Sequence, residues 1–186
     1  MTQHEPAAAR WLNFCALAIG LFVAVVGLLN VLPSYGIFPR FGPFSVAWFR
    51  PLFFGAAICT VVLTHLAGRL DQEKLSRPEI LLWIAIGALG VWACWDYYVI
   101  YTILNEAVMF FTMHETVIAL LAAGIVLLLC WASWGLPIAL LGFIALVYLA
   151  TGQYWPGFLR KAPNDFVETI AQNIWYDADQ GILGSI

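Results

Sequence analysis

Histidine is the first side chain in this sequence to examine for chemistry, because two histidines on neighbouring membrane helices can bind a haem iron between them. His4 precedes the first apolar run, His65 lies at the end of the second, and His114 begins the fourth. His65 and His114 are therefore predicted at opposite faces of a bilayer, where they cannot share one iron. The sequence predicts no haem, no metal site and no other cofactor in this chain.

Asp96 is an acidic residue well inside an apolar run, where ionisable side chains are by default candidates for ion pathways. Arg50 lies near the start of the preceding apolar run and Asp96 near the end of the next one, so two antiparallel helices would place both at similar depth. We therefore predict a structural Arg50–Asp96 ion pair. Snorkelling of the side chains to the interface and an ion-coupling role for Asp96 are the alternatives.

Motifs for catalysis are missing from the sequence. It contains no GxSxG, no HExxH, no phosphate-binding loop and no paired carboxylates, so we expect no enzyme. Each of the four cysteines falls in a different apolar run without CxxC spacing, which is typical of small buried hydrophobic residues (Cys15, Cys59, Cys94 and Cys130).

The composition indicates a membrane protein. Hydrophobic residues make up 63% of the chain and charged residues 10%, against roughly 25% charged in soluble domains. The formal net charge is -3 and the basic residues are scattered, so nucleic acid is not an expected partner. Nine tryptophans lie mostly near the ends of apolar runs, where they are expected to anchor helices at the membrane interface.

The apolar runs predict an all-α integral membrane protein with four to five transmembrane helices, since each run approaches the roughly 18 residues needed to cross a bilayer. Residues 1–10 are expected to form a cytoplasmic tail and residues 11–151 the transmembrane module. Its predicted spans are 11–32, 44–66, 79–100, 116–131 and a run ending near 151.

The connections between these runs differ in character. Residues 68–78 are the most charged and are expected to form a loop in water, whereas residues 101–113 stay fairly apolar and are expected to lie at the interface. Gly135 and Pro137 break the helical pattern, which favours two spans joined by a tight turn over one long kinked helix.

Residues 152–186 are expected to form a turn and then an amphipathic interfacial helix. Apolar residues recur there at helical spacing (Phe166, Val167, Ile170, Ile174 and Trp175), opposite polar ones (Asp165, Glu168, Gln172 and Asn173). Asp165 and Glu168 have the spacing of a capping pair at its start. Because the segment is acidic, we expect it to contact protein or a less anionic leaflet rather than anionic lipid.

Three motifs in the carboxyl-terminal third resemble one family. They are Trp134-Gly135-Leu136-Pro137-Ile138 at the start of a helix, Tyr154-Trp155-Pro156-Gly157 at a turn, and Asp179-Gln180-Gly181-Ile182-Leu183-Gly184 after the amphipathic segment. This order is similar to the junction region of TRAP transporter permeases of the TAXI type. The resemblance covers about fifty residues well and the preceding spans only in general layout.

The resemblance implies a small membrane subunit, or the amino-terminal membrane module of a fused permease, in the cytoplasmic (inner) membrane of a prokaryote. Such transporters take up organic anions with a sodium or proton gradient and an extracytoplasmic substrate-binding protein. The large membrane subunit would hold the substrate and coupling-ion sites, while this module would act as a scaffold. The brace would be the segment with Phe166, Val167, Ile170, Ile174 and Trp175.

Two other membrane subunits are compatible with the sequence. A membrane anchor of a respiratory or redox complex is the main alternative. The small subunit of a tripartite tricarboxylate transporter shares the four-span layout but does not account for residues 154–184.

Overall fold

The computed structural model describes residues 7–32, 42–71, 76–106, 111–160, 166–176 and 182–183, and every regular element in these ranges is helical. Five long helices are α1 (Ala7–Val31), α2 (Val46–Asp71), α3 (Arg77–Glu106), α4 (Met113–Trp134) and α5 (Leu136–Thr151). Each, with η1 added to α5, is long and apolar enough to cross a membrane. The expected all-α membrane protein is confirmed, with five candidate spans.

The described carboxyl-terminal elements are short. They are the 3₁₀ turns η1 (Gly152–Tyr154) and η2 (Gly157–Leu159), the α-helix α6 (Phe166–Ile170) and the π-helix η3 (Ala171–Tyr176). The chain forms two compact units whose boundary falls within α3, between Val91 and Trp92.

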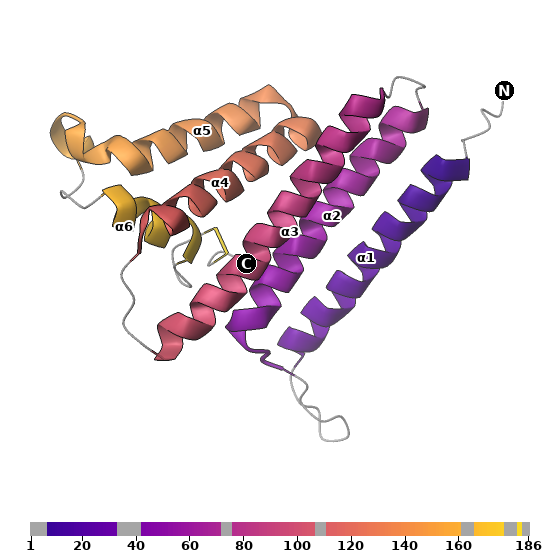
Figure 1. Cartoon of the computed structure of the whole chain (residues 1–186), viewed down its shortest axis with the longest axis horizontal. Helices are drawn as coiled ribbons and strands as arrows, with labels where there is room; N and C mark the ends of the chain where they lie inside the picture. The colour runs from indigo at the N-terminus through magenta and orange to yellow at the C-terminus, as the bar shows by residue number, and fades with distance from the viewer. Residues whose placement is uncertain are drawn as a thin grey trace. The chain divides into compact units, whose positions relative to one another are not determined.

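The first unit contains α1, α2 and the first half of α3. Helices α1 and α2 run side by side (Figure 1). Glycines lie at both helix contacts of α2: a Cβ built on Gly27 of α1 would lie 3.5 Å from Phe53, and one built on Gly87 of α3 would lie 3.6 Å from Val62. Close approach at small residues is a common way to pack helices in lipid.

The charged connection of the first unit is shorter than predicted. Helix α2 continues through Asp71, and α3 begins at Arg77, so the predicted loop 68–78 is helical at both ends. The carbonyl of Ser76 accepts a hydrogen bond from the Ile80 amide at 3.1 Å, and Arg69 Nε donates to Glu79 at 3.1 Å. Each helix therefore continues beyond its apolar run, and the Arg69–Glu79 pair joins the two helix ends.

The connection before α4 is also more helical than predicted. Helix α3 continues to Glu106, so the first half of the expected interfacial connection 101–113 is part of that helix. The end of an apolar run does not mark the end of the helix here, because backbone hydrogen bonding does not require an apolar side chain at each position.

The second unit contains a helical hairpin of α4 and α5 joined by one residue, Gly135, at φ 86°. Only glycine adopts this left-handed region readily, and Pro137 fits the first turn of α5, where no amide donor is needed. The amide of Gly135 still donates to the Trp131 carbonyl at 3.0 Å. The prediction of two helices with a tight turn is confirmed.

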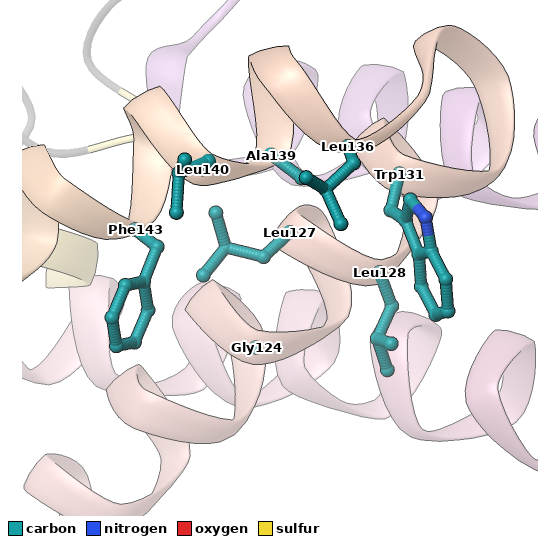
Figure 2. A pocket seen from close by; sticks show the side chains of 8 residues that line it. All are labelled: Gly124, Leu127, Leu128, Trp131, Leu136, Ala139, Leu140 and Phe143. Carbon is teal, nitrogen blue, oxygen red and sulfur yellow. The ribbon is translucent and has the colours of Figure 1, made fainter.

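An open apolar groove of about 490 Å³ lies along this hairpin (Figure 2). Its lining contributes almost no polar atoms and consists of Gly124, Leu127, Leu128, Trp131, Leu136, Ala139, Leu140 and Phe143. Leu127 points between the helices, and a Cβ at Gly142 would come within 2.9 Å of it. No residue of α5 is fully buried in this chain.

The carboxyl-terminal segment differs from the single amphipathic helix predicted. It begins as a five-residue α-helix and widens into the π-helix η3, which packs on α4. Ile170, Ala171 and Trp175 are fully buried, and Ile182 donates its amide to the Ile174 carbonyl at 2.7 Å. The predicted apolar residues Ile174 and Trp175 are buried as expected, whereas the buried Ala171 and Tyr176 lie outside the predicted apolar face, because a π-helix shifts the side-chain period.

Candidate functional site

The amino terminus of α4 is built by a capping box on Thr112 and Glu115. The Thr112 side chain accepts from the His114 amide at 3.3 Å, and the Glu115 carboxylate accepts from the Thr112 amide at 2.7 Å. Two amide donors that an α-helix leaves without partners at its start are thereby satisfied. Glu115 is buried with 5% of its surface exposed, so the carboxylate depends on these donors.

Neighbouring side chains extend this box in two directions. The His114 imidazole lies 3.4 Å from the second oxygen of Glu115 and is largely exposed. The buried Thr116 hydroxyl donates to the Thr112 carbonyl at 3.1 Å and lies 3.4 Å from the Val167 carbonyl of α6. The start of α4 is therefore tied to the carboxyl-terminal segment.

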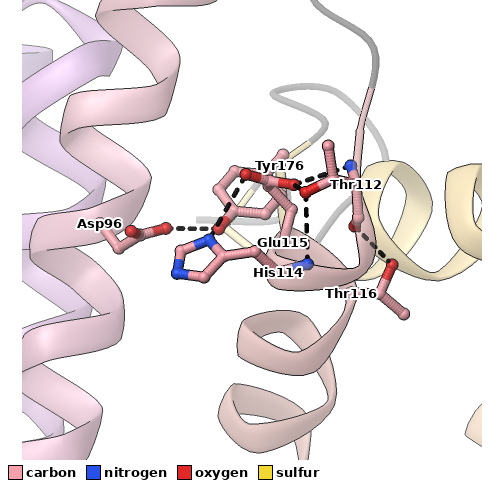
Figure 3. A network of polar contacts seen from close by, with 6 residues as sticks. All are labelled: Asp96, Thr112, His114, Glu115, Thr116 and Tyr176. Carbon is pink, nitrogen blue, oxygen red and sulfur yellow. Dashed lines mark hydrogen bonds and ion pairs between the residues drawn. The ribbon is translucent and has the colours of Figure 1, made fainter.

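A second polar contact joins the end of that segment to α3. The Tyr176 hydroxyl donates to Asp96 at 2.5 Å, across 80 positions in the sequence (Figure 3). Tyr176 is 3% exposed, and Asp96 is half-buried. Burial raises the pKa of Tyr176 well above its ordinary value, and Asp96 and Glu115 raise it further. The phenol therefore keeps its proton and acts as a donor.

Aromatic rings surround the phenol. Tyr176 stacks on Tyr97 with ring centroids 6.2 Å apart and on Phe111 at 5.6 Å. Tyr97 also stacks on Tyr101 at 5.7 Å and meets Trp175 edge to face at 6.3 Å. Offset and edge-to-face ring pairs add to the stabilisation by burial. Tyr176 is therefore held in a stack of aromatic rings, while its partner Asp96 stays half-buried.

The arrangement is suited to holding a segment in place. Asp96 and Glu115 each accept from hydroxyl or amide donors, and η3 supplies both the donor Tyr176 and the buried Trp175. Hydrogen bonds in an apolar environment are strong because water does not compete for the donors. The site therefore fixes where the chain leaves η3. Among the described residues, no group of three or more His, Cys, Asp or Glu side chains is placed to hold a metal ion.

The predicted ion pair stays a prediction. Arg50 lies half-buried in α2 of the first unit, and Asp96 lies in the part of α3 that belongs to the second unit. Asp96 accepts the Tyr176 hydrogen bond, a partner that the sequence did not suggest.

The five brace residues fall into two groups. Ile170, Ile174 and Trp175 are buried, while Val167 is half-buried and Phe166 is 48% exposed. The predicted capping pair lies outside what the structure describes, because Asp165 and the Glu168 side chain are not in the described set.

Of the described histidines, His114 belongs to this site and His65 lies in the first unit. His65 stacks on Trp83 of α3 in the first unit, with ring centroids 4.0 Å apart. Cys94 is buried, Cys59 and Cys130 are half-buried, and Cys15 is exposed on α1.

Sequence reasoning missed three residues of the site, and for two of them a signal was present. Thr112 and Glu115 have the S/T-x-x-E spacing of a capping box directly before an apolar run. Tyr176 had no such signal, because its partner is remote in sequence and the π-helix changes which face it occupies.

The fold and the site define a multi-pass α-helical membrane protein with a buried carboxyl-terminal segment. No protein-family model matches the chain, and no curated protein or solved structure matches it. The resemblance to TAXI-type permeases is therefore a resemblance of sequence motifs alone.

Proposed function

We propose that this chain is the small membrane module of a TAXI-type TRAP transporter, acting as a scaffold for a large transport subunit. The observation that carries the proposal is the docking of α6 and η3 on α4, completed by the Tyr176–Asp96 hydrogen bond. In the resembled family, this segment leads into the transport domain. Because α6 and η3 are held on α4, they can hold a transport domain that contacts them in a defined position.

Three further features agree with this role. Five apolar spans provide a large surface for a membrane partner, and α1 and α5 keep most of their surface exposed. The Trp134–Ile138 motif spans the α4–α5 turn, and its Leu136, Pro137 and Ile138 form the first turn of α5. The segment contacts protein, as a brace does, through Ile170 and Trp175.

The proposed system takes up organic anions across a prokaryotic inner membrane, driven by a sodium or proton gradient and supplied by an extracytoplasmic binding protein. The substrate and ion sites would lie in the large membrane subunit. This module would perform no chemistry itself.

The test is purification of the complex from native membranes through a tag on this chain, followed by mass spectrometry. We expect a large polytopic partner, or a continuation of this chain into one, and gradient-driven uptake of organic anions after reconstitution with the binding protein. Haem-bearing or iron–sulfur subunits, or a lone oligomer, would overturn the proposal.

A matched pair of variants tests the brace itself. Trp175→Ala removes a fully buried indole from η3, whereas Trp134→Ala removes one that is 70% exposed at the α4–α5 turn. In a complex of separate subunits, recovery of the partner should fall for Trp175→Ala and stay near wild type for Trp134→Ala. In a fused permease, the same contrast should appear in uptake. Equal behaviour of both variants would contradict a bracing role for η3.

A further inference from the structure

Helix α5 is too short to cross a bilayer as an α-helix alone. It has 16 residues, which at a rise of about 1.5 Å per residue span about 24 Å, against about 30 Å of hydrocarbon. The three residues of η1, at about 2.0 Å each, bring the length to about 30 Å. The crossing is therefore completed by residues that are not α-helical.

Exposed aromatic side chains mark both ends of this crossing. Trp131 and Trp134 are 56% and 70% exposed at the α4–α5 turn, and Tyr154 and Phe158 are 79% and 95% exposed at the other end. Aromatic rings favour the level of the lipid headgroups, where one side is apolar and the other is wet. The two aromatic groups are separated by α5 and η1, whose combined length matches the thickness of the hydrocarbon core.

Residues 152–159, which we call the aromatic turn, contain two backbone turns with their own hydrogen bonds. Trp155 donates its amide to the Gly152 carbonyl at 3.3 Å, and Arg160 donates to the Gly157 carbonyl at 3.2 Å. Gly157 has φ 65°, which allows the second of these turns. Satisfied backbone groups are a requirement for a segment that leaves water.

Two side-chain hydrogen bonds also hold the aromatic turn against α5. The Tyr148 hydroxyl of α5 donates to the Leu159 carbonyl at 2.9 Å, and the Trp155 indole donates to the Thr151 hydroxyl at 3.0 Å. Tyr148 and Trp155 also meet edge to face at 5.3 Å. The turn is thus tied back to its helix, and Phe158 points outward from it.

We propose that the aromatic turn lies at the boundary between hydrocarbon and headgroups, with Tyr154 and Phe158 inserted among the lipids. Arg160, which follows directly and is exposed, would reach the lipid phosphates with its guanidinium and keep its stem against the chains. We infer that lipid, and not another protein, surrounds Tyr154 and Phe158, because α5 and η1 together have the length of one hydrocarbon crossing and end at the aromatic turn. The inference needs only the five spans and is independent of the transporter proposal.

The test is photo-crosslinking of the full chain in phosphatidylcholine–phosphatidylglycerol vesicles, with benzoylphenylalanine incorporated in place of Phe158. Phe158 is almost wholly exposed, so the substitution leaves the fold intact. Phe143 of α5, 52% exposed, is the matched lipid-facing position, and the exposed Ser76 before α3 is the matched water-facing one. Intact-protein mass spectrometry reports the mass of each adduct.

We expect phospholipid adducts at position 158 in a yield comparable to that at position 143. At position 76 we expect no phospholipid adducts. A yield at position 158 as low as at position 76 would place the turn in water and overturn the inference. Adducts with a second copy or another protein at position 158 would overturn it too, since that surface would then be an interface.

Discussion

The two units of the chain differ in the partners of their charged side chains. In the first unit, Arg69 and Glu79 form an ion pair at the α2–α3 connection with 40% and 23% of their side chains exposed. In the second unit, Asp96 and Glu115 accept hydrogen bonds from hydroxyl and amide groups. Burying an ion pair requires desolvating two charges, whereas burying a carboxylate with a neutral donor requires desolvating one charge.

This difference predicts where the chain is sensitive to mutation. A screened, partly hydrated ion pair contributes little to stability, while a buried donor and its aromatic surroundings contribute more. The second unit should therefore respond strongly to single substitutions in η3, and the first unit weakly to loss of its ion pair.

The largest effect is expected for Trp175→Ala. The indole is fully buried, and removing it leaves a cavity against Tyr97. Loss of a buried aromatic side chain typically costs about 3–5 kcal/mol. Thermal unfolding in detergent should show a large drop in midpoint.

Trp134→Ala is the matched control for this prediction, because its ring is mostly exposed at the end of α4. Its midpoint should stay close to wild type. Similar drops for both variants would mean that η3 contributes no more to stability than an exposed tryptophan.

An intermediate effect is expected for Tyr176→Phe, which removes one hydroxyl and keeps the ring stack on Tyr97 and Phe111. The variant leaves the Asp96 carboxylate without this donor, a loss of about 1–3 kcal/mol. Tyr154→Phe, at a 79% exposed position, should change nothing measurable. Equal melting curves for Tyr176→Phe and wild type would refute a role of the hydroxyl in holding η3.

The same hydroxyl predicts how stability depends on pH. The folded chain raises the pKa of Tyr176 above its ordinary 10.0, so the folded state keeps the proton that the unfolded state releases. The stabilisation is complete below pH 10 and declines above it, by at most about 1.4 kcal/mol per pH unit. The difference in stability between wild type and Tyr176→Phe should therefore narrow steadily as the pH rises above about 10.

The sequence predicted the fold of the spans well, because lipid requires long apolar runs and leaves a plain signal. Gly135 and Pro137 correctly indicated a tight turn between two helices, because their backbone restrictions are local, although the predicted span 116–131 ended three residues before α4 does. Helix ends at Asp71 and Glu106 were harder, because a helix can continue into polar residues once hydrophobicity has ended.

The candidate site was predicted only in part. Asp96 was singled out by its position in an apolar run, and Trp175 by helical spacing. The Tyr176–Asp96 contact could not be derived, because it depends on tertiary packing over 80 positions and on a π-helix that periodicity does not reveal. Thr112 and Glu115 were within reach through their spacing.

The smallest effect is expected for Glu79→Gln in the first unit. The substitution removes the charge that pairs with Arg69 but keeps the size of the side chain, and the pair is partly exposed and screened by salt. The melting midpoint should shift less than for Tyr176→Phe, and the shift should shrink further as salt is raised. Melting curves of wild type and Glu79→Gln at low and high salt measure both quantities. A shift as large as that of Tyr176→Phe, unchanged by salt, would show that the two units do not differ in how they hold charge, since the Arg69–Glu79 pair would then behave as a buried contact.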